Sequence, residues 1–294
     1  MNTNRSKLLK TIIATISIVL SLFEIYTAAT IPFTAFEQRS VHLGLVFALV
    51  FLYDAVDREN KYLRLLDYML AVISLILNAY IFFNWDKIGM RTTALTNADI
   101  TVSILLIVFV LSTTYKTIGV WMPIISVIFI LYSIFGPYMP GLLRFRGISL
   151  NRALSSICLS SEGIYGATTG VSATFVFMFL LFGEFLLSYG GGTFIMDLAQ
   201  AAFGGMRGAA PKIAVIASGL FGMVSGSATA NVAATGTFTI PLIKKRGYSS
   251  EFAGGIVAAA TTGGLLMPPV MGTAAFIMAE MIGMPYGEVC LIAA

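Results

Sequence analysis

The chain is organised around residues Pro211–Pro269, which read PKIAVIASGLFGMVSGSATANVAATGTFTIPLIKKRGYSSEFAGGIVAAATTGGLLMPP. Two apolar runs, Ile213–Val224 and Val232–Ile243, are each far shorter than the roughly 20 residues that a membrane-spanning helix needs. Small and polar residues (SGSATAN) separate the runs, and Lys244–Arg246 follows the second. The pattern predicts a re-entrant helical hairpin over residues 211–246, in which two half-length helices enter and leave by the same membrane face.

The helix that follows, predicted over residues 252–282, contains a second break. It is interrupted at Thr261-Thr262-Gly263-Gly264 and again at Pro268-Pro269. Proline removes a backbone donor and restricts the residue before it. Because non-helical backbone at membrane depth occurs only inside protein or beside a polar cavity, two neighbouring breaks indicate the ion or substrate site of a secondary transporter.

The composition is that of a polytopic, all-α membrane protein. Apolar residues make up 57% of the 294 residues, charged residues only 11%, and the mean hydropathy is +0.89. Basic residues are scattered between apolar runs, which does not favour a nucleic-acid partner. His42 is the only histidine, so an enzyme built on histidine catalysis or a multi-histidine metal site is excluded within this chain. We expect His42 near a helix end at the membrane interface, and Cys158 and Cys290 as small packing residues.

Six membrane spans precede the hairpin in this interpretation. They are predicted at residues 8–29, 41–53 (extended if Gln38–Ser40 join it), 65–83, 100–115, 118–135 and 168–187. The first span is interpreted as a retained helix and not as a cleaved signal peptide, because it is long and contains Glu24. Arginines among Leu and Ile predict an amphipathic interfacial helix over residues 139–163, with an ordinary loop as the alternative. A further surface helix is predicted over residues 194–203.

The distribution of Lys and Arg predicts the orientation. With the N-terminus inside, the inner segments hold Arg5, Lys7, Lys10, Arg58, Lys61, Arg64, Lys116, Arg207, Lys212, Lys244, Lys245 and Arg246. The outer segments hold Arg39, Lys87, Arg91, Arg144, Arg146 and Arg152. The excess inside favours a cytoplasmic N-terminus and places both ends of the predicted hairpin on the cytoplasmic side.

Oxygen atoms at the two breaks could bind a sodium ion. Such a hard cation prefers several oxygen ligands, and broken helices offer freed carbonyls beside Ser, Thr and Asn side chains. The candidates are Ser225, Ser227, Thr229 and Asn231 at the tip, with Thr261, Thr262 and the carbonyls near Gly263 and Gly264 in the second break. The helix starts that follow each break could attract a carboxylate. The alternative is that small residues only allow the helices to pack closely.

The same residues carry a family resemblance. The motifs SGLFG-x-x-SGSATANV-x-x-TGTFTIPL-x-K-x-x-GY-x-x-EFAG and TGG-x-x-MPPVMG-x-AAFIMAE resemble the membrane subunit of tripartite ATP-independent periplasmic (TRAP) transporters. The resemblance is specific from about Gly119 to Tyr286 and is strongest to fused permeases that work with TAXI-type binding proteins. It implies a bacterial inner-membrane protein that takes up a small organic anion with sodium as coupling ion. It also implies a periplasmic substrate-binding protein as partner and an elevator mechanism, with residues 1–117 as a four-helix scaffold and 118–294 as the start of the transport domain.

The resemblance assigns roles residue by residue. It implies ion binding by Ser225, Gly226, Ser227, Asn231, Thr261, Thr262 and Gly263, and substrate binding by Thr229, Gly264, Pro268 and Pro269. Three acids in or near spans, Glu24, Glu184 and Glu280, have no evident partner in the sequence. Glu24 and Glu184 could snorkel or pair between helices or act in transport, whereas Glu280 favours a structural role. Asn78 is expected to form an interhelical hydrogen bond.

Only one hairpin and one double break occur in these 294 residues. Transporters built from inverted repeats form their site between two such halves. We therefore expect a second half outside this sequence, in the same or another chain. The alternatives to sodium-coupled uptake are a truncated or split half that does not transport alone and, more remotely, a passive channel.

Overall fold

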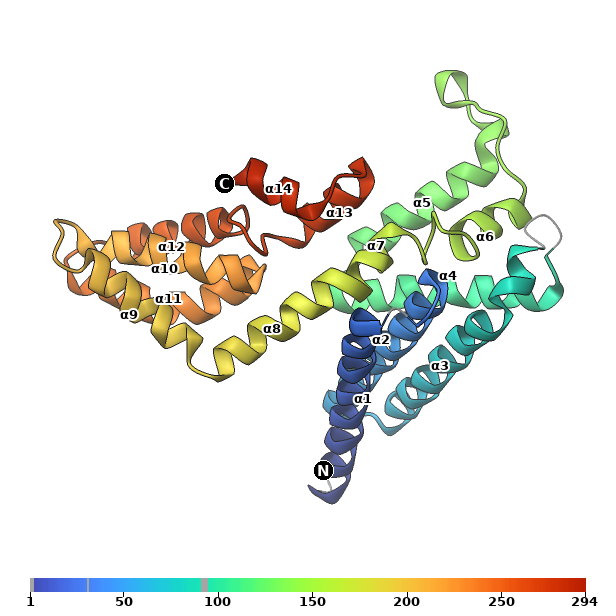
Figure 1. The fold of residues 1–294 in the computed structure, drawn as a ribbon. Coiled ribbons are helices and arrows are strands. Elements are labelled where there is room, and N and C mark those ends of the chain that lie inside the picture. Colours follow the sequence, from blue (N-terminus) through green and yellow to red (C-terminus); the bar gives the residue numbers. More distant parts are fainter. Residues whose placement is uncertain (1–2, 31, 91–94) are drawn as a thin grey trace. The chain divides into compact units, whose positions relative to one another are not determined.

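The secondary structure in the described part of the chain is helical. The computed structural model describes residues 3–30, 32–90 and 95–294, and for residues 3–6 it describes the backbone only. Within these ranges six helices are long and apolar enough to cross a membrane, and a bent pair would make a seventh. This confirms the predicted all-α membrane class. Two compact units divide between Ala173 and Thr174, and each is described separately below (Figure 1).

The first unit holds the first five spans. Its helices are α1 (Thr3–Thr30), α2 (Ala35–Asp57), α3 (Lys61–Gly89), α4 (Asn97–Ile118), α5 (Trp121–Phe135), α6 (Leu150–Cys158) and α7 (Ala167–Val171). Capping boxes begin two of the spans: Thr34 with Glu37 at α2 and Thr96 with Asp99 at α4. Because α2 starts at Ala35, the second span is longer than the predicted residues 41–53. Arg91 and the side chain of Arg5, used in the orientation count, lie outside the described residues.

The expected amphipathic helix over residues 139–163 is shorter in the structure. Only α6 is α-helical, and two 3₁₀ turns, Gly136–Tyr138 and Gly141–Leu143, precede it. Pro140 lacks a backbone donor, and Gly141 and Gly147 have φ values of 58° and 68°. A left-handed backbone cannot continue a right-handed helix, so the regular structure begins only at Leu150.

Side chains of α2, α3 and α4 form the core of the first unit, which includes Phe51, Ile81 and Leu106. The expected bond of Asn78 exists, but its partner lies in the segment before α7: the Tyr165 hydroxyl donates to Asn78 Oδ1 at 2.8 Å. Tyr165 is fully buried. This bond joins α3 to the connection between α6 and α7.

An ion network closes one end of the same three helices. Lys116 Nζ of α4 lies 2.7 Å from Asp54 Oδ2 of α2 and 2.9 Å from Asp67 Oδ1 of α3. Arg58 Nε lies 3.5 Å from Asp67 Oδ2. Lys116 also sits 4.3 Å from the centroid of the Phe51 ring. Since Asp67 is 3% exposed, these two cations take the place of the water that would otherwise solvate its carboxylate.

Replacing Lys116 by methionine is expected to lower the free energy of unfolding by about 1.5–3 kcal/mol, because a buried carboxylate loses a charged hydrogen bond. Thermal denaturation of the purified protein measures this effect. Lys10→Met, which removes an exposed lysine of α1, should change stability by less than about 0.5 kcal/mol. Equal effects of the two substitutions would contradict the proposed role of Lys116.

The second unit contains the predicted hairpin and broken helix. Its helices are α8 (Phe177–Ser188), α9 (Gly191–Phe203), α10 (Ala209–Ser225), α11 (Ala228–Lys245), α12 (Ser250–Gly264), α13 (Thr273–Ile282) and α14 (Tyr286–Ala293). A π-helical stretch, Ser172–Val176, joins α7 to α8 within one apolar span, Ala167–Ser188. Helices α9 to α12 pack on one another through small and aliphatic residues such as Ala214, Ala217 and Val257. The pair α13 and α14 is bent by 119°.

Candidate functional site

The two arms of the hairpin, α10 and α11, are joined by a buried polar cross-link. Asn231 is 0% exposed, and its Nδ2 donates to the Ser218 carbonyl at 2.7 Å. The Thr235 hydroxyl donates to the Asn231 carbonyl at 2.8 Å and lies 3.2 Å from both Asn231 Oδ1 and the Ser218 hydroxyl. The contacts of Ser218 with Asn231 and Thr235 cross between the two arms, whereas the Thr235–Asn231 bonds lie within α11. Buried polar groups are therefore satisfied across the hairpin.

The tip itself is two residues, Gly226 and Ser227, between the helices. Gly226 ends α10 with φ 58°, a left-handed conformation that favours glycine. Ser227 caps α11, since its hydroxyl accepts from the Ala230 amide at 3.3 Å. The same hydroxyl lies 3.1 Å from the Thr229 hydroxyl. Ser225 Oγ makes only long contacts of 3.5 Å with Ser227, so this hydroxyl is weakly engaged.

The second break lies against this tip. Helix α12 ends at Gly264, and residues 265–272 lead to α13 without α-helical structure. In that segment the Val270 amide donates to the Met223 carbonyl of α10 at 3.2 Å. A Cβ on Gly226 would lie 2.8 Å from the Met271 carbonyl. The structure thus brings together two breaks that are separated by about forty residues in the sequence.

Helices α10 and α12 approach closely beside the tip through two glycines. A Cβ on Gly222 would lie 2.6 Å from Gly264 Cα, and a Cβ on Gly264 would lie 2.9 Å from the Ser218 carbonyl and 3.3 Å from Asn231 Nδ2. Backbone occupies the space where side chains would be. Both glycines are therefore required for this contact.

The predicted residues of α12 do not all face the hairpin. Thr261 is buried, and its hydroxyl donates to the carbonyls of Val257 and Ala258. Thr262 is exposed, and a Cβ on Gly263 would have nothing within 4 Å. Within the described residues, the structure brings Gly264 against the hairpin that carries Ser225, Gly226, Ser227, Thr229 and Asn231. Thr261 is buried with its hydroxyl bonded inside α12, and Thr262 and Gly263 lie on the exposed side of α12.

Tyr286, which the sequence did not mark as a site residue, donates a hydrogen bond to backbone carbonyls of the break. The hydroxyl of Tyr286, on α14, lies 3.0 Å from the Pro269 carbonyl and also contacts the Val270 carbonyl. Its ring stacks on Phe276 with centroids 4.1 Å apart. The peptide bond between Pro268 and Pro269 is cis. The sequence signal for Tyr286 is weak, since it is one aromatic residue beside Pro285.

A cavity of about 800 Å³ lies beside the tip. Gly226 borders it, together with Leu265, Met271 and Met278. The first turn of α13, Thr273–Ala275, also lines the cavity. The residue before that turn, Gly272, has no side chain to cap it. The start of α13 therefore borders the cavity, and the Ala275 amide of this turn donates to the Gly272 carbonyl at 2.9 Å.

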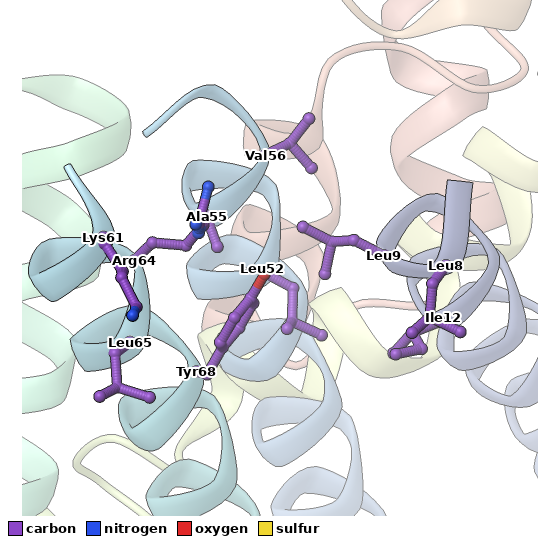
Figure 2. A pocket seen from close by; sticks show the side chains of 10 residues that line it. All are labelled: Leu8, Leu9, Ile12, Leu52, Ala55, Val56, Lys61, Arg64, Leu65 and Tyr68. Atoms are coloured by element: carbon purple, nitrogen blue, oxygen red, sulfur yellow. The ribbon is translucent and has the colours of Figure 1, made fainter. Parts of the chain in front are cut away.

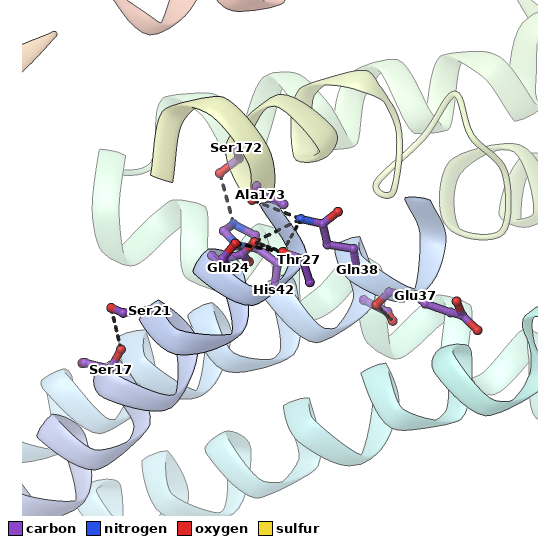
Figure 3. A network of polar contacts seen from close by, with 10 residues as sticks. Ser17, Ser21, Glu24, Thr27, Glu37, Gln38, His42, Ser172 and Ala173 are labelled. Carbon is purple, nitrogen blue, oxygen red and sulfur yellow. Dashed lines mark hydrogen bonds and ion pairs between the residues drawn. The ribbon is translucent and has the colours of Figure 1, made fainter. Parts of the chain in front are cut away.

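Glu24 and His42 form a buried network in the first unit (Figure 3). His42 is 4% exposed and Glu24 1%, so both side chains are enclosed by protein, and Glu24 pairs between helices, which is one of the alternatives given for it above. His42 Nδ1 lies 2.8 Å from Glu24 Oε1, and His42 Nε2 lies 3.1 Å from the Ser172 hydroxyl. Gln38 Nε2 donates to Glu24 Oε2 and to the Thr27 hydroxyl, both at 3.1 Å. The network ties α1, α2 and the π-helical stretch together.

The order Ser172–His42–Glu24 is that of a hydrolase relay, but the surroundings of Ser172 are not those of a nucleophile. A relay serine works beside amides that stabilise an oxyanion. The Ser172 amide is already donated to the carbonyls of Thr168 and Thr169 within the helix. We therefore interpret the network as an interhelical connection.

Other candidate residues have simpler places. Glu184 on α8 and Glu280 on α13 are both exposed. Cys158 is fully buried, as expected of a packing residue, and its thiol donates to the Ser103 carbonyl at 3.3 Å. Burial raises the pKa of the Cys158 thiol to about 12. In the described part of the chain, His, Cys, Asp and Glu side chains do not gather in groups of three that could hold a metal ion.

Residues 105–294 match the model of a family described as "Tripartite ATP-independent periplasmic transporter, DctM component". The chain belongs to this TRAP transporter family. The family is one of multi-pass membrane permeases and not of enzymes. This agrees with the resemblance on the hairpin motifs, at the level of the TRAP large permease.

Curated TRAP permeases are similar to part of the chain. The C4-dicarboxylate TRAP transporter large permease protein DctM of Pseudomonas aeruginosa is 42% identical over 91 residues, 31% of this chain and 21% of that protein. The Vibrio cholerae protein of the same description is 33% identical over 116 residues, 39% of this chain and 26% of that protein. The matches thus span about a fifth to a quarter of these relatives' length. No solved structure matches the chain.

Proposed function

We propose that this TRAP permease takes part in sodium-coupled uptake of a small organic anion across the bacterial inner membrane, with a periplasmic binding protein that delivers the substrate. The observation that carries this proposal is the contact between the hairpin tip and the break after α12, at Gly226 and Met271. Broken helices that meet in this way are the usual setting for ions and substrates in secondary transporters.

Sodium is the ion that suits the tip. The side chains of Ser225, Ser227 and Thr229 supply neutral oxygens, and the tip sequence SGSATAN contains no acid. A monovalent cation can bind such oxygens without a compensating carboxylate, whereas a divalent one usually takes carboxylates. The side chains of Asn231 and Thr261 already donate hydrogen bonds to backbone carbonyls, so they would hold the backbone around the ion in position.

An organic anion suits the neighbouring cavity. The relatives' names specify C4-dicarboxylate, isethionate and sialic acid, which are organic anions. We infer a carboxylate near the first turn of α13, because residues 273–275 line the cavity and the start of a helix carries partial positive charge. The path of the substrate to this cavity would be shaped by Gly264, Pro268 and Pro269. Thr229 would contact the substrate from the hairpin tip.

The finer assignments belong to the same proposal. The N-terminus would lie in the cytoplasm, residues 1–117 would form the scaffold, and the remainder would move as an elevator. The TAXI subtype is proposed from the fused arrangement, in which three spans and the start of a fourth precede the matched segment. Transport would use a second hairpin and broken helix contributed by the same or another chain.

Ser225→Ala tests the ion site with little risk to the fold, since the Ser225 hydroxyl makes only long contacts. In the complete tripartite system, reconstituted into proteoliposomes with the binding protein, the sodium concentration for half-maximal uptake should rise about tenfold, as loss of one ligand costs on the order of 1.4 kcal/mol. Thr237→Ala, an exposed threonine of α11, should not change it. Uptake that needs neither sodium nor the binding protein would instead indicate a passive channel.

A further inference from the structure

An apolar groove that two cationic side chains help to line lies in the first unit (Figure 2). Its volume is about 440 Å³. Leu9 and Ile12 of α1 form one wall, Leu52 and Ala55 of α2 form the floor, and Tyr68 of α3 stands on the other wall. Helix α2 packs against both α1 and α3, which leaves the groove open between the outer two helices.

The groove lies at one end of three consecutive spans. It uses the first turns of the span Lys7–Thr30, the last turns of Ala35–Asp57 and the first turns of Lys61–Gly89. Consecutive spans alternate in direction, so these three ends meet at the same membrane surface. The groove therefore opens at the depth where lipid headgroups lie, and its apolar floor runs toward the acyl chains.

The two cations, Lys61 and Arg64, come from the first turn of α3. A cation there is unfavourable to the helix, because the N-terminus of a helix carries partial positive charge. Neither is ion-paired with another residue that the structure describes, whereas Arg58 beside them is paired with Asp67. The acids of the nearby turn, Asp57 and Glu59, do not line the groove. A ligand with negative charge would balance both cations.

We propose that this groove binds an anionic phospholipid of the bilayer. The phosphate would lie between Lys61 and Arg64, and one acyl chain would lie along Leu9, Ile12 and Leu52. Basic pockets between membrane helices bind acidic headgroups in this manner, and each cation near the surface favours an anionic lipid. The lipid would cover the exposed apolar side chains that line the groove between α1 and α3, among them Leu8 (63% exposed) and Leu65 (55% exposed).

Native mass spectrometry of the purified chain, titrated with phosphatidylglycerol or phosphatidylcholine of the same acyl composition, tests the proposal. The first phosphatidylglycerol should bind about tenfold more tightly than phosphatidylcholine, because two cations contribute. In the double variant Lys61→Gln/Arg64→Gln the preference should fall to within about twofold. The double variant Lys61→Arg/Arg64→Lys keeps both charges and should retain most of the preference for phosphatidylglycerol.

The matched control is Lys244→Gln/Lys245→Gln, which removes the same charge from exposed positions at the end of α11. This variant should keep the tenfold preference. A wild-type chain without preference, or a preference that survives Lys61→Gln/Arg64→Gln, would overturn the proposal. Equal losses in the two charge-removing variants would also overturn it, since net charge alone would then explain the binding.

Discussion

Replacing Glu24 by alanine is expected to lower the free energy of unfolding by about 3–5 kcal/mol, the usual cost of removing one member of a buried, charge-assisted hydrogen-bonded pair. The carboxylate is fully enclosed, and it holds His42 Nδ1 at 2.8 Å and Gln38 Nε2 at 3.1 Å. Without it, buried His42 Nδ1 loses its partner, and part-buried Gln38 Nε2 keeps only the Thr27 hydroxyl and the Ala173 carbonyl. The midpoint of thermal unfolding should fall by roughly 10 °C.

Two variants separate this effect from a general sensitivity of the first unit. Glu59→Ala removes an exposed acid from the turn between α2 and α3 and should change stability by less than about 0.5 kcal/mol. Glu24→Gln keeps an acceptor for one donor, so its free energy of unfolding should fall less than that of Glu24→Ala. A Glu24→Ala protein as stable as the wild type would show that the pair does not hold α1 to α2.

The second large effect is expected at Gly222, where alanine should reduce substrate uptake by at least about tenfold and stability by about 1–3 kcal/mol. A Cβ there would lie 2.6 Å from Gly264 Cα, and backbone cannot rotate away as a side chain can. Helices α10 and α12 would have to separate, which would move Asn231 and the tip relative to the break. Uptake by the complete system and thermal unfolding measure the two losses.

Gly255→Ala is the matched control for Gly222→Ala. Gly255 is an exposed residue of α12, and a Cβ there would meet nothing within 4 Å. Alanine favours a helix interior over glycine by roughly 0.5–1 kcal/mol, so this variant should be slightly stabilised and should transport normally. Glycine-to-alanine substitution should thus lower the stability of the protein at Gly222 and slightly raise it at Gly255. Similar losses at both would contradict the close contact.

The sequence predicted the hairpin and the broken helix because their signals are local. Short apolar runs, a Ser-Gly-Ser tip and a Pro pair are visible within a few residues of one another. The helix over residues 139–163 was predicted too long because its arginine spacing was weighed above Gly141 and Gly147, which adopt left-handed conformations. Local sequence signals therefore predicted the positions of the breaks more accurately than the ends of the helices.

Contacts between distant segments could not be predicted from a single sequence. His42 pairs with Glu24 across 18 positions and with Ser172 across 130, and no periodic pattern connects them. Tyr286 reaches the carbonyl of Pro269 only because α14 bends back beside α13. The chemistry of these residues was recognisable, but their partners depend on how the helices pack.

If the tip and the break form a sodium site, sodium ions should stabilise the folded chain more than potassium ions do. The midpoint of thermal unfolding of the purified chain would be compared in NaCl and KCl at equal concentration. Because a bound ligand stabilises the folded state, by about 2.7 kcal/mol at a hundred times its Kd, sodium should raise the midpoint above its value in potassium. Ser225→Ala should reduce that difference, while Thr237→Ala should keep it. Equal midpoints in the two salts for the wild-type chain would contradict the account.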